Sequence, residues 1–413
     1  MATTDQTGRP ASDDLRRAVK GTNALTAAWC EVAPPGEFVI SGAGAWPLLA
    51  LLEAGASGRA LDELREATGV KPEEASALAV DLMTHLGAIG VDAALALWIR
   101  AGARINASWA TELPVSAFRE LPQGEDAAHA AINRWASEAT SGRISDVDVA
   151  IHEQTALVLV SALRTAFEWR QPFSLGRVQW LDQEVVGLRR WSAPIDDFGV
   201  IDGGKPVARF VSRGSSNIDV HLLSGPPDLS PAAVFRTGIE AVVSPRRCTS
   251  AADMTKERDV GALRLVLRET TQRWGTIDMP AFTIRSRHDL LASAGVFGLQ
   301  TARVLGDHFP RIARELSVDT ATQQGYASFQ TTGFEAAAVT IMSMPTRARI
   351  SEPPPRQRYL CAEMVLDRPF GFLVVHQPTQ LVLFAGWVTT PVPPEEPEEH
   401  FPPGTPLRMR PLR

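Results

Sequence analysis

Few side chains in this sequence combine the residue types and the spacing that catalysis requires. Asp197-Phe198-Gly199 spells the DFG tripeptide of protein kinases, but no HRD loop precedes it and no glycine-rich loop opens the chain. Gly42-Ala43-Gly44 lacks the third glycine of a dinucleotide-binding turn. The sequence contains neither a GxSxG nucleophile turn nor an HExxH zinc motif. We therefore expect that the protein is not an enzyme.

Metal-binding residue types are equally sparse. The eight histidines are scattered, and none has a cysteine or a second histidine at ligand spacing. The three cysteines, Cys30, Cys248 and Cys361, lie far apart, which excludes a disulfide-rich scaffold. Buried free thiols are the favoured interpretation, with one disulfide as the alternative. The sequence predicts no metal site and no cofactor.

The charge balance and the hydropathy exclude two classes of partner. With 413 residues, 41 Lys+Arg and 47 Asp+Glu, the chain has a net charge of −6 and no basic runs, so we expect no nucleic-acid partner. No run of 18 apolar residues occurs, so no membrane span is predicted. The polar N-terminus lacks the apolar core of a signal peptide, which favours a cytoplasmic protein, with an extracellular one as the alternative.

Hydrophobic periodicity predicts a helical first third and a strand-rich remainder. Helices are expected over residues 46–54, 58–69, 72–90 and 127–140. Strands are expected over residues 91–100, 155–169, 184–191, 205–213 and 217–225, and residues 273–295 run from strand to helix. Residues 370–376 and 381–388 flank a Gln-Pro-Thr-Gln turn and predict a hairpin of two buried strands. Residues 391–413 contain eight prolines and predict an extended tail.

Residues 331–344, TTGFEAAAVTIMSM, have an unusual composition. A glycine, a glutamate and three alanines lead into a stretch of Thr, Ser and Met, and prolines and arginines follow. Taken alone, this segment favours a helix of small residues followed by a linker. The segments around it change that interpretation.

The block TGFEAAAVT resembles the hinge of the reactive loop of serpins, and five further segments resemble serpin signatures in the family's order. Those segments are residues 51–69, 132–144, 155–173, 277–290 and 366–391. INRWASEATSGRI, for example, is similar to the family pattern INxWVxxxTxGxI. Each match alone is weakly specific, but six in the same order are strongly specific, and they cover about residues 14–391.

The resemblance implies an α+β fold in which helices and smaller sheets surround one large central sheet. It implies a single domain over residues 14–391, where the length alone would also allow two domains. A flexible N-terminus over residues 1–13 and a Pro-rich tail over residues 392–413 would lie outside that domain. A reactive loop, about residues 333–355, would stand outside the body as bait for a protease. We expect a monomer whose partner is a serine protease.

The resemblance also implies that the cut loop enters the central sheet as an extra strand, led by its hinge. The expected hinge residues are Gly333, Phe334, Glu335, Ala336, Ala337, Ala338, Val339 and Thr340. Every second side chain of a strand faces the interior, and Ala336, Ala338 and Thr340 are small enough for that side. Glu335, Ala337 and Val339 would face the other side. Phe334 belongs to the inward series, and its ring is expected to cost about 1–3 kcal/mol on entry because the family usually carries Thr or Ser there.

Three positions correspond to the family's structural switch region, namely Ser41, Ser161 and Trp169. Trp169 is retained, but Ser161 replaces the usual Asn, and Ser41-Gly42-Ala43-Gly44 replaces an SPxS turn. Gln323 stands where the family places a His, and Thr331 and Thr332 stand where it favours acidic residues. These changes leave open whether the family's buried polar network is kept.

Family spacing places the cut bond between Arg347 and Ala348, with Arg349–Ile350 as the alternative. Arginine before the bond suits a trypsin-like protease, whose specificity pocket is acidic. The leading interpretation is a suicide-substrate inhibitor of serine proteases. The alternative is a non-inhibitory binding or storage protein that a protease only cuts, and Phe334 and the changed switch residues support it.

Overall fold

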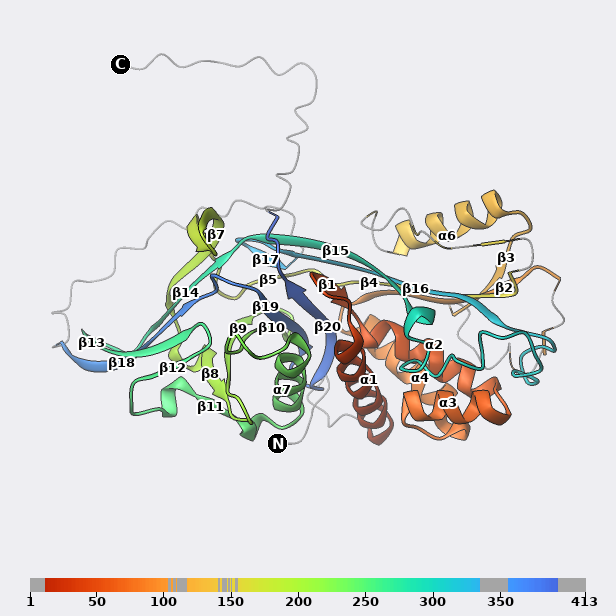
Figure 1. Ribbon diagram of the computed structural model, residues 1–413, viewed down its shortest axis with the longest axis horizontal. Helices are drawn as coiled ribbons and strands as arrows, with labels where there is room; N and C mark the ends of the chain where they lie inside the picture. The colour runs from red at the N-terminus through yellow and green to blue at the C-terminus, as the bar shows by residue number, and fades with distance from the viewer. Residues whose placement is uncertain are drawn as a thin grey trace, which may run out of the picture.

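The computed structural model describes residues 12–102, 105–106, 109, 117–139, 142, 147, 149, 151–152, 155–334 and 356–392. Figure 1 shows the elements in chain order along the molecule. The helices are α1 (Asp13–Val32), α2 (Gly42–Gly55), α3 (Gly58–Thr68), α4 (Pro72–Ala88), α6 (Glu125–Ala139) and α7 (Pro231–Val243). Short 3-10 turns are η1 (Ile195–Asp197), η2 (Pro245–Arg247), η3 (Ala251–Asp253) and η4 (Leu290–Ser293).

The strands of the described residues form three sheets. The central sheet has the order β3 (Phe118–Leu121), β2 (Asp92–Arg100), β4 (Leu157–Arg164), β16 (Val318–Phe329), β17 (Gly333–Phe334) and β5 (Phe167–Glu168), and β15 (Phe282–Asp289) also pairs with β16. The second sheet has the order β1 (Phe38–Ile40), β20 (Leu381–Val388), β19 (Phe370–His376), β10 (Ile218–Ser224), β9 (Val207–Arg213), β8 (Phe198–Ile201) and β11 (Cys248–Ser250). The third has the order β12 (Arg258–Val260), β13 (Leu263–Thr270), β18 (Gln357–Val365), β14 (Gly275–Pro280), β7 (Gln183–Ala193) and β6 (Ser174–Trp180).

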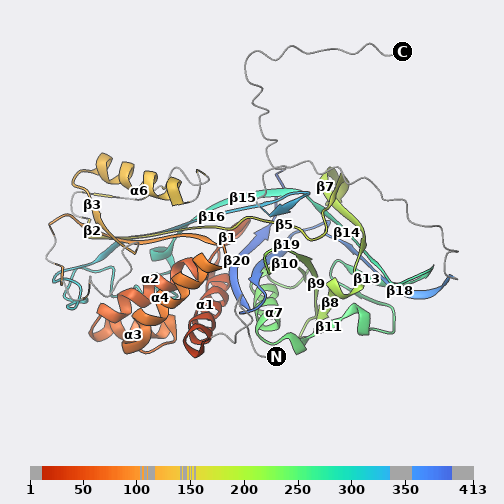
Figure 2. The same ribbon diagram turned by 180° about the vertical axis from the view of Figure 1, so that it is seen from behind.

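The helices cover both faces of the central sheet at one end of the molecule. In Figure 1, α6 lies above the sheet, whereas α2, α3 and α4 lie below it. The third sheet lies at the opposite end, and Figure 2 shows the same arrangement from behind. An α+β fold with one large sheet, smaller sheets and surrounding helices was expected, and it is confirmed.

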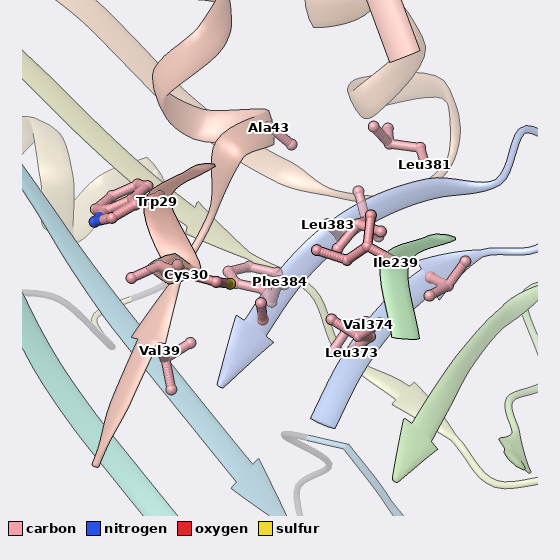
Figure 3. Packing of buried hydrophobic residues seen from close by; sticks show 14 of the residues in the cluster. Trp29, Cys30, Val39, Ala43, Ile239, Leu373, Val374, Leu381, Leu383 and Phe384 are labelled. Atoms are coloured by element: carbon pink, nitrogen blue, oxygen red, sulfur yellow. The ribbon is translucent and has the colours of Figure 1, made fainter. Parts of the chain in front are cut away.

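The main core lies where helices close over the hairpin of β19 and β20. Figure 3 shows Cys30 of α1, Ile239 of α7 and Leu373 of β19 gathered near Phe384 of β20. Every residue of both strands is buried, which explains why the predicted hairpin shows a continuous apolar run instead of alternation. Each fully buried aliphatic or aromatic side chain contributes roughly 1.5–3 kcal/mol.

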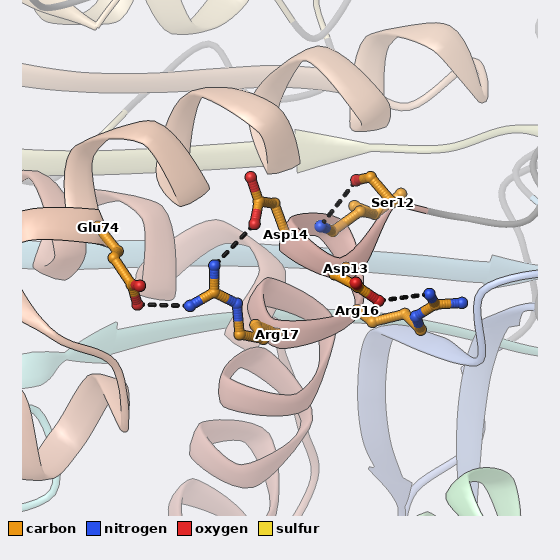
Figure 4. A network of polar contacts seen from close by, with 7 residues as sticks. Ser12, Asp13, Asp14, Arg16, Arg17 and Glu74 are labelled. Carbon is orange, nitrogen blue, oxygen red and sulfur yellow. Dashed lines mark hydrogen bonds and ion pairs between the residues drawn. The ribbon is translucent and has the colours of Figure 1, made fainter.

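The helix α1 begins inside the segment that was expected to lie outside the domain. The Ser12 hydroxyl accepts a hydrogen bond from the backbone N–H of Leu15 at 3.1 Å, which caps the helix. Figure 4 shows this cap beside three ion pairs, in which Arg16 contacts Asp13 and Arg17 contacts both Asp14 and Glu74. Ser12 and Asp13 therefore belong to the folded body, and residues 1–11 lie outside the described residues.

Most predicted elements agree with the structure to within a few residues, and two do not. The single strand expected over residues 155–169 is divided into β4 and β5, with Thr165 and Ala166 between them. After β15, the expected helix is only the 3-10 turn η4. The long helix α1 was not among the expected elements, although its N-cap serine and two acidic residues are a typical start signal.

Candidate functional site

Two neighbouring strands of the central sheet, β4 and β16, run parallel, and the boundary between them is called the seam. Their register runs from Thr320 opposite Val158 to Gln324 opposite Ala162, with an irregularity below Thr320. Parallel strands normally pair through evenly spaced, slanted hydrogen bonds, in sheets whose two faces are both covered. Here the pairing of β4 with β16 ends at Ala162 and Gln324, before the carboxyl end of β16. Beyond this point a third segment lies between β16 and β5.

That segment is β17, which consists of Gly333 and Phe334. Phe334 pairs antiparallel with Phe329 of β16 on one side and with Phe167 of β5 on the other. Gly333 lies opposite Glu168 of β5. The start of the expected hinge therefore already occupies the position that an additional strand between β4 and β16 would take.

Backbone and side-chain hydrogen bonds fix the chain leading into β17. The Trp169 indole Nε1–H donates to the carbonyl of Gln330 at 2.9 Å, and its backbone N–H donates to the carbonyl of Thr332 at 2.9 Å. The backbone N–H of Phe173 donates to the carbonyl of Thr331 at 2.8 Å. Trp169, a predicted switch residue, thus fixes the two residues Gln330 and Thr332 just before the expected hinge.

The ring of Phe334 lies in an aromatic cluster and is only 1% exposed. It stacks on Phe167 with ring centroids 5.6 Å apart, and it contacts Phe329 and Phe372 at 6.5 and 6.4 Å. Such aromatic pairs add about 0.5–1.5 kcal/mol each beyond burial. The ring thus has a place in the sheet of the uncut chain, and the cost expected for its entry stays a prediction.

A buried polar network lies under the middle of the seam. The Gln323 side-chain oxygen accepts from the Ser41 N–H at 2.7 Å, and its Nε2 donates to the Ser41 carbonyl at 2.9 Å. The same Nε2 donates to Ser161 Oγ at 3.2 Å, which joins β16 to β4 across the seam. The question left open by the sequence is thus answered, since a network of Ser41, Ser161 and Gln323 is present with residues that differ from the family's usual ones.

Gly44 at the start of α2 makes this network sterically feasible. A Cβ atom at Gly44 would lie 2.3 Å from Ser161 Oγ and 2.8 Å from Gln323 Nε2, which real structures do not tolerate. The Gly44 N–H also donates to Ser41 Oγ at 3.2 Å, which caps the helix. The glycine that replaces the second serine of the family's turn therefore leaves room for the glutamine.

A second polar contact, which the sequence interpretation missed, joins β4 and β16 near their amino-terminal ends. This end of the seam is called its foot. Asp319 Oδ2 on β16 accepts from the N–H groups of Ala156 and Leu157 at 2.6 and 3.4 Å, where β4 begins. Ser317 Oγ donates to the other carboxylate oxygen at 2.8 Å. The strand β16 was not among the predicted elements, and only the fold shows that Asp319 lies beside the start of β4.

Comparison with known proteins decides the family. The family model described as Serpin (serine protease inhibitor) matches residues 22–180 and 242–391. This chain belongs to the serpin family. An uncharacterised serpin-like protein of Pyrobaculum aerophilum is 24% identical over 369 residues, which cover 86% of this chain and 89% of that protein.

Solved structures show the same fold. A highly specific serpin of the insect Tenebrio molitor has a TM-score of 0.68 at 17% identity, covering 92% of this chain and 98% of that one. Human thyroxine-binding globulin complexed with thyroxine has a TM-score of 0.70 at 16% identity, covering 92% and 99%. At these identities the likeness establishes the serpin fold alone.

Buried charges support the hinge of this serpin from the third sheet. The Arg190 guanidinium is 4% exposed, lies 3.9 Å from the ring centroid of Phe173 and donates to the carbonyl of Gln171. Burial lowers the pKa of Arg190 to about 10. Nearby, burial raises the pKa of Asp197, and its ion pair with Arg213 at 2.7 Å opposes that rise. Arg190 thus packs the residue whose N–H holds Thr331.

The remaining predicted site residues lie outside the described residues. These are Glu335, Ala336, Ala337, Ala338, Val339, Thr340, Arg347 and Ala348, together with the alternative bond Arg349–Ile350. The Pro-rich segment beyond Val392 also lies outside them. The structure therefore describes the first two hinge residues and the whole seam.

Three further predictions concern thiols, metals and membranes. Cys30, Cys248 and Cys361 are all free; Cys30 and Cys361 are buried as expected, whereas Cys248 is only half-buried. Among the described residues, no three His, Cys, Asp or Glu side chains gather closely enough to hold a metal ion. No helix in the same part of the chain is long and apolar enough to cross a bilayer.

Proposed function

We propose that this serpin is a suicide-substrate inhibitor of serine proteases, with a trypsin-like enzyme as the favoured target. The observation that carries the proposal is the position of β17, which pairs antiparallel with both β16 and β5 at the open end of the seam. Because Gly333 and Phe334 already pair as a short strand, the rest of the loop could continue this strand between β4 and β16.

The β17 register, continued without a bulge, gives the length of that path. Val318 at the foot of β16 lies eleven residues before Phe329, so it would face Pro345, which lies eleven residues after Phe334. Residues 333–345 would then fill the seam. The proposed cut bond, Arg347–Ala348, follows two residues later, so a protease attached to Arg347 would be carried to the foot.

The same register gives Thr340 a partner on each side. Gln323 lies six residues before Phe329 and Ser161 six before Phe167, while Thr340 lies six after Phe334. Entry of the hinge would separate the Gln323–Ser161 hydrogen bond and place the Thr340 hydroxyl between the two side chains. A hydroxyl can donate and accept, so it can restore both contacts.

The chemistry begins in the protease, whose serine hydroxyl attacks the carbonyl carbon of Arg347. The peptide bond to Ala348 breaks, its amine leaves with a proton, and an ester joins Arg347 to the protease. Water would normally hydrolyse that ester. Insertion of the freed hinge must displace and distort the attached protease before this hydrolysis occurs.

The driving force lies in the sheet. Entry of one strand replaces a single parallel ladder between β4 and β16 with two antiparallel ladders, which are slightly more stable per residue. Each additional hydrogen bond contributes about 0.5–1.5 kcal/mol net. Opposing this gain are the Gln323–Ser161 and Asp319–Leu157 contacts, which must break first.

Incubation with trypsin tests the proposal. We expect a covalent complex that survives boiling in detergent, and a released C-terminal fragment that begins at Ala348. Arg347→Gln should abolish the complex, whereas the matched control Arg349→Gln should retain it. The reverse pattern, with a fragment beginning at Ile350, would move the cut to the alternative bond.

A cut loop with fully active trypsin would overturn the proposal. That outcome would support the alternative, a non-inhibitory serpin that serves as a binding or storage protein. Trypsin whose catalytic serine is chemically blocked provides the control, because it should bind the loop without forming an ester.

A further inference from the structure

A polar pocket of about 660 Å³ lies at the foot of the seam. One wall comes from the end of β2 and the residue before β4, represented by Arg100 and Ala156. The opposite wall comes from the segment that leads into β16, represented by Arg314 and Leu316. In Figure 1 the strands β2 and β16 reach this end of the sheet, away from β17. The pocket therefore bridges the two sides that insertion must separate.

Arg100, on one wall of the pocket, has a guanidinium nitrogen to which no described residue hydrogen-bonds. Its side chain is half-buried, and its Nε–H donates to the carbonyl of Thr155 at 2.9 Å. Its Nη2 is buried and has no hydrogen-bond partner among the described residues. An unsatisfied buried donor costs about 1–3 kcal/mol, so an anion that neutralised the guanidinium would relieve a real penalty.

The rest of the lining has the chemistry of an oxyanion site. Among the described lining residues, Arg314 supplies a second guanidinium and Glu315 the single carboxylate, so these residues together carry a net positive charge. Guanidinium groups bind carboxylate and phosphate oxygens through paired, charge-assisted hydrogen bonds. The pocket volume admits an anion of the size of phosphate or a short dicarboxylate with its hydration water.

We propose that this pocket binds a small oxyanion and that the bound anion holds the foot of the seam closed. An anion contacting Arg100 and Arg314 ties the side of β4 to the side of β16. Insertion of a strand moves these sides apart by about 4.8 Å, the spacing of one strand. The anion therefore binds the intact form and not the inserted form, and by linkage it opposes insertion.

The claim that the anion opposes insertion rests on the proposed inhibitory function, whereas the claim that it binds the intact chain does not. At an anion concentration ten times its dissociation constant, the insertion equilibrium shifts by about tenfold toward the intact form. A high oxyanion concentration would thus keep a larger fraction of the protein in the intact form.

Calorimetric titration of the intact chain with inorganic phosphate, against chloride at equal ionic strength, tests the site. We expect saturable binding that Arg100→Gln weakens at least tenfold. Arg314→Gln, at an exposed position, is a second variant that should weaken binding without affecting folding. The matched control Arg303→Gln changes an exposed arginine outside the pocket and should leave binding unchanged. Absence of saturation with both phosphate and succinate, or equal binding by Arg100→Gln and the wild type, overturns the site.

The same titration of the loop-cleaved chain tests the closure of the seam. We expect phosphate to raise the melting temperature of the intact chain and to leave that of the cleaved chain unchanged. Equal binding to both forms overturns the closure. Failure of the proposed function is recognised separately, because the cleaved chain would then melt at the same temperature as the intact chain without any phosphate.

Discussion

The two ends of the seam between β4 and β16 are built from different chemistry. At the β17 end, the ring of Phe334 stacks on Phe167 inside an apolar cluster, and β17 pairs with β5 and β16. At the foot, the Asp319 carboxylate bonds to the backbone of β4, beside a pocket lined by Arg100. One end has apolar contacts that insertion would preserve, and the other has polar contacts that insertion would break.

This difference indicates where the barrier to insertion lies. Contacts present both before and after a transition change the stability of both states and leave their difference unchanged. Contacts present only before it oppose the transition. We therefore expect substitutions around Phe334 to alter overall stability, and substitutions at Asp319 or Ser161 to alter the rate and extent of insertion.

The largest effect is expected in the hinge itself. Ala338 would face Gly325 and Leu163 on the buried side of the inserted strand, so Ala338→Glu would bury an unpaired carboxylate at a cost of several kcal/mol. The yield of detergent-stable trypsin complex should fall by about 100-fold or more. Ala337→Glu places the same charge on the opposite face and should retain most of the complex. Equal losses in both variants would contradict the alternation.

Phe334→Ala should have the next largest effect, and it acts on stability. Truncation of a buried phenyl ring typically costs about 3–5 kcal/mol. Because the ring occupies the same site before and after insertion, the melting temperatures of the intact and the cleaved chain should fall together, as measured by calorimetry. A fall confined to one of the two forms would show that the ring moves. Phe334→Thr should behave in the same direction and should not improve inhibition.

Asp319→Asn tests whether the polar contact at the foot opposes insertion. The carboxylate makes charge-assisted bonds that are worth about 1.5–3 kcal/mol, whereas neutral ones are worth about 0.5–1.5 kcal/mol. We expect a loss of about 1 kcal/mol in the intact form alone and insertion about fivefold faster, measured as the rate of trypsin inactivation. Ser317→Ala removes only the supporting hydroxyl and should have a smaller effect. An unchanged rate would exclude the foot from the barrier.

Ser161→Ala is expected to have the smallest effect. It removes one neutral hydrogen bond across the seam, while Gln323 Nε2 still donates to the Ser41 carbonyl. The intact form should lose less than about 1 kcal/mol in chemical denaturation, and trypsin inactivation should change by no more than a few-fold. A large loss would show that the middle of the seam, and not its foot, controls opening.

Local patterns in the sequence determined much of the fold. Helices such as α2 and α4 and the buried hairpin of β19 and β20 follow from periodicity, proline and glycine, which act over a few residues. The order of motifs also identified the family. Alternation placed Phe334 on the inward side, where the structure buries it.

Only the tertiary structure decided what those residues contact. The surroundings of the Phe334 ring could not be predicted, because they are built by Phe167, Phe329 and Phe372, which lie far apart in the chain. Gln323 keeps the polar network because Gly44, from another element, leaves it room. Asp319 closes the foot only because β16 lies beside the start of β4. Sequence patterns specify local conformation, whereas contacts between distant segments depend on how the whole chain packs.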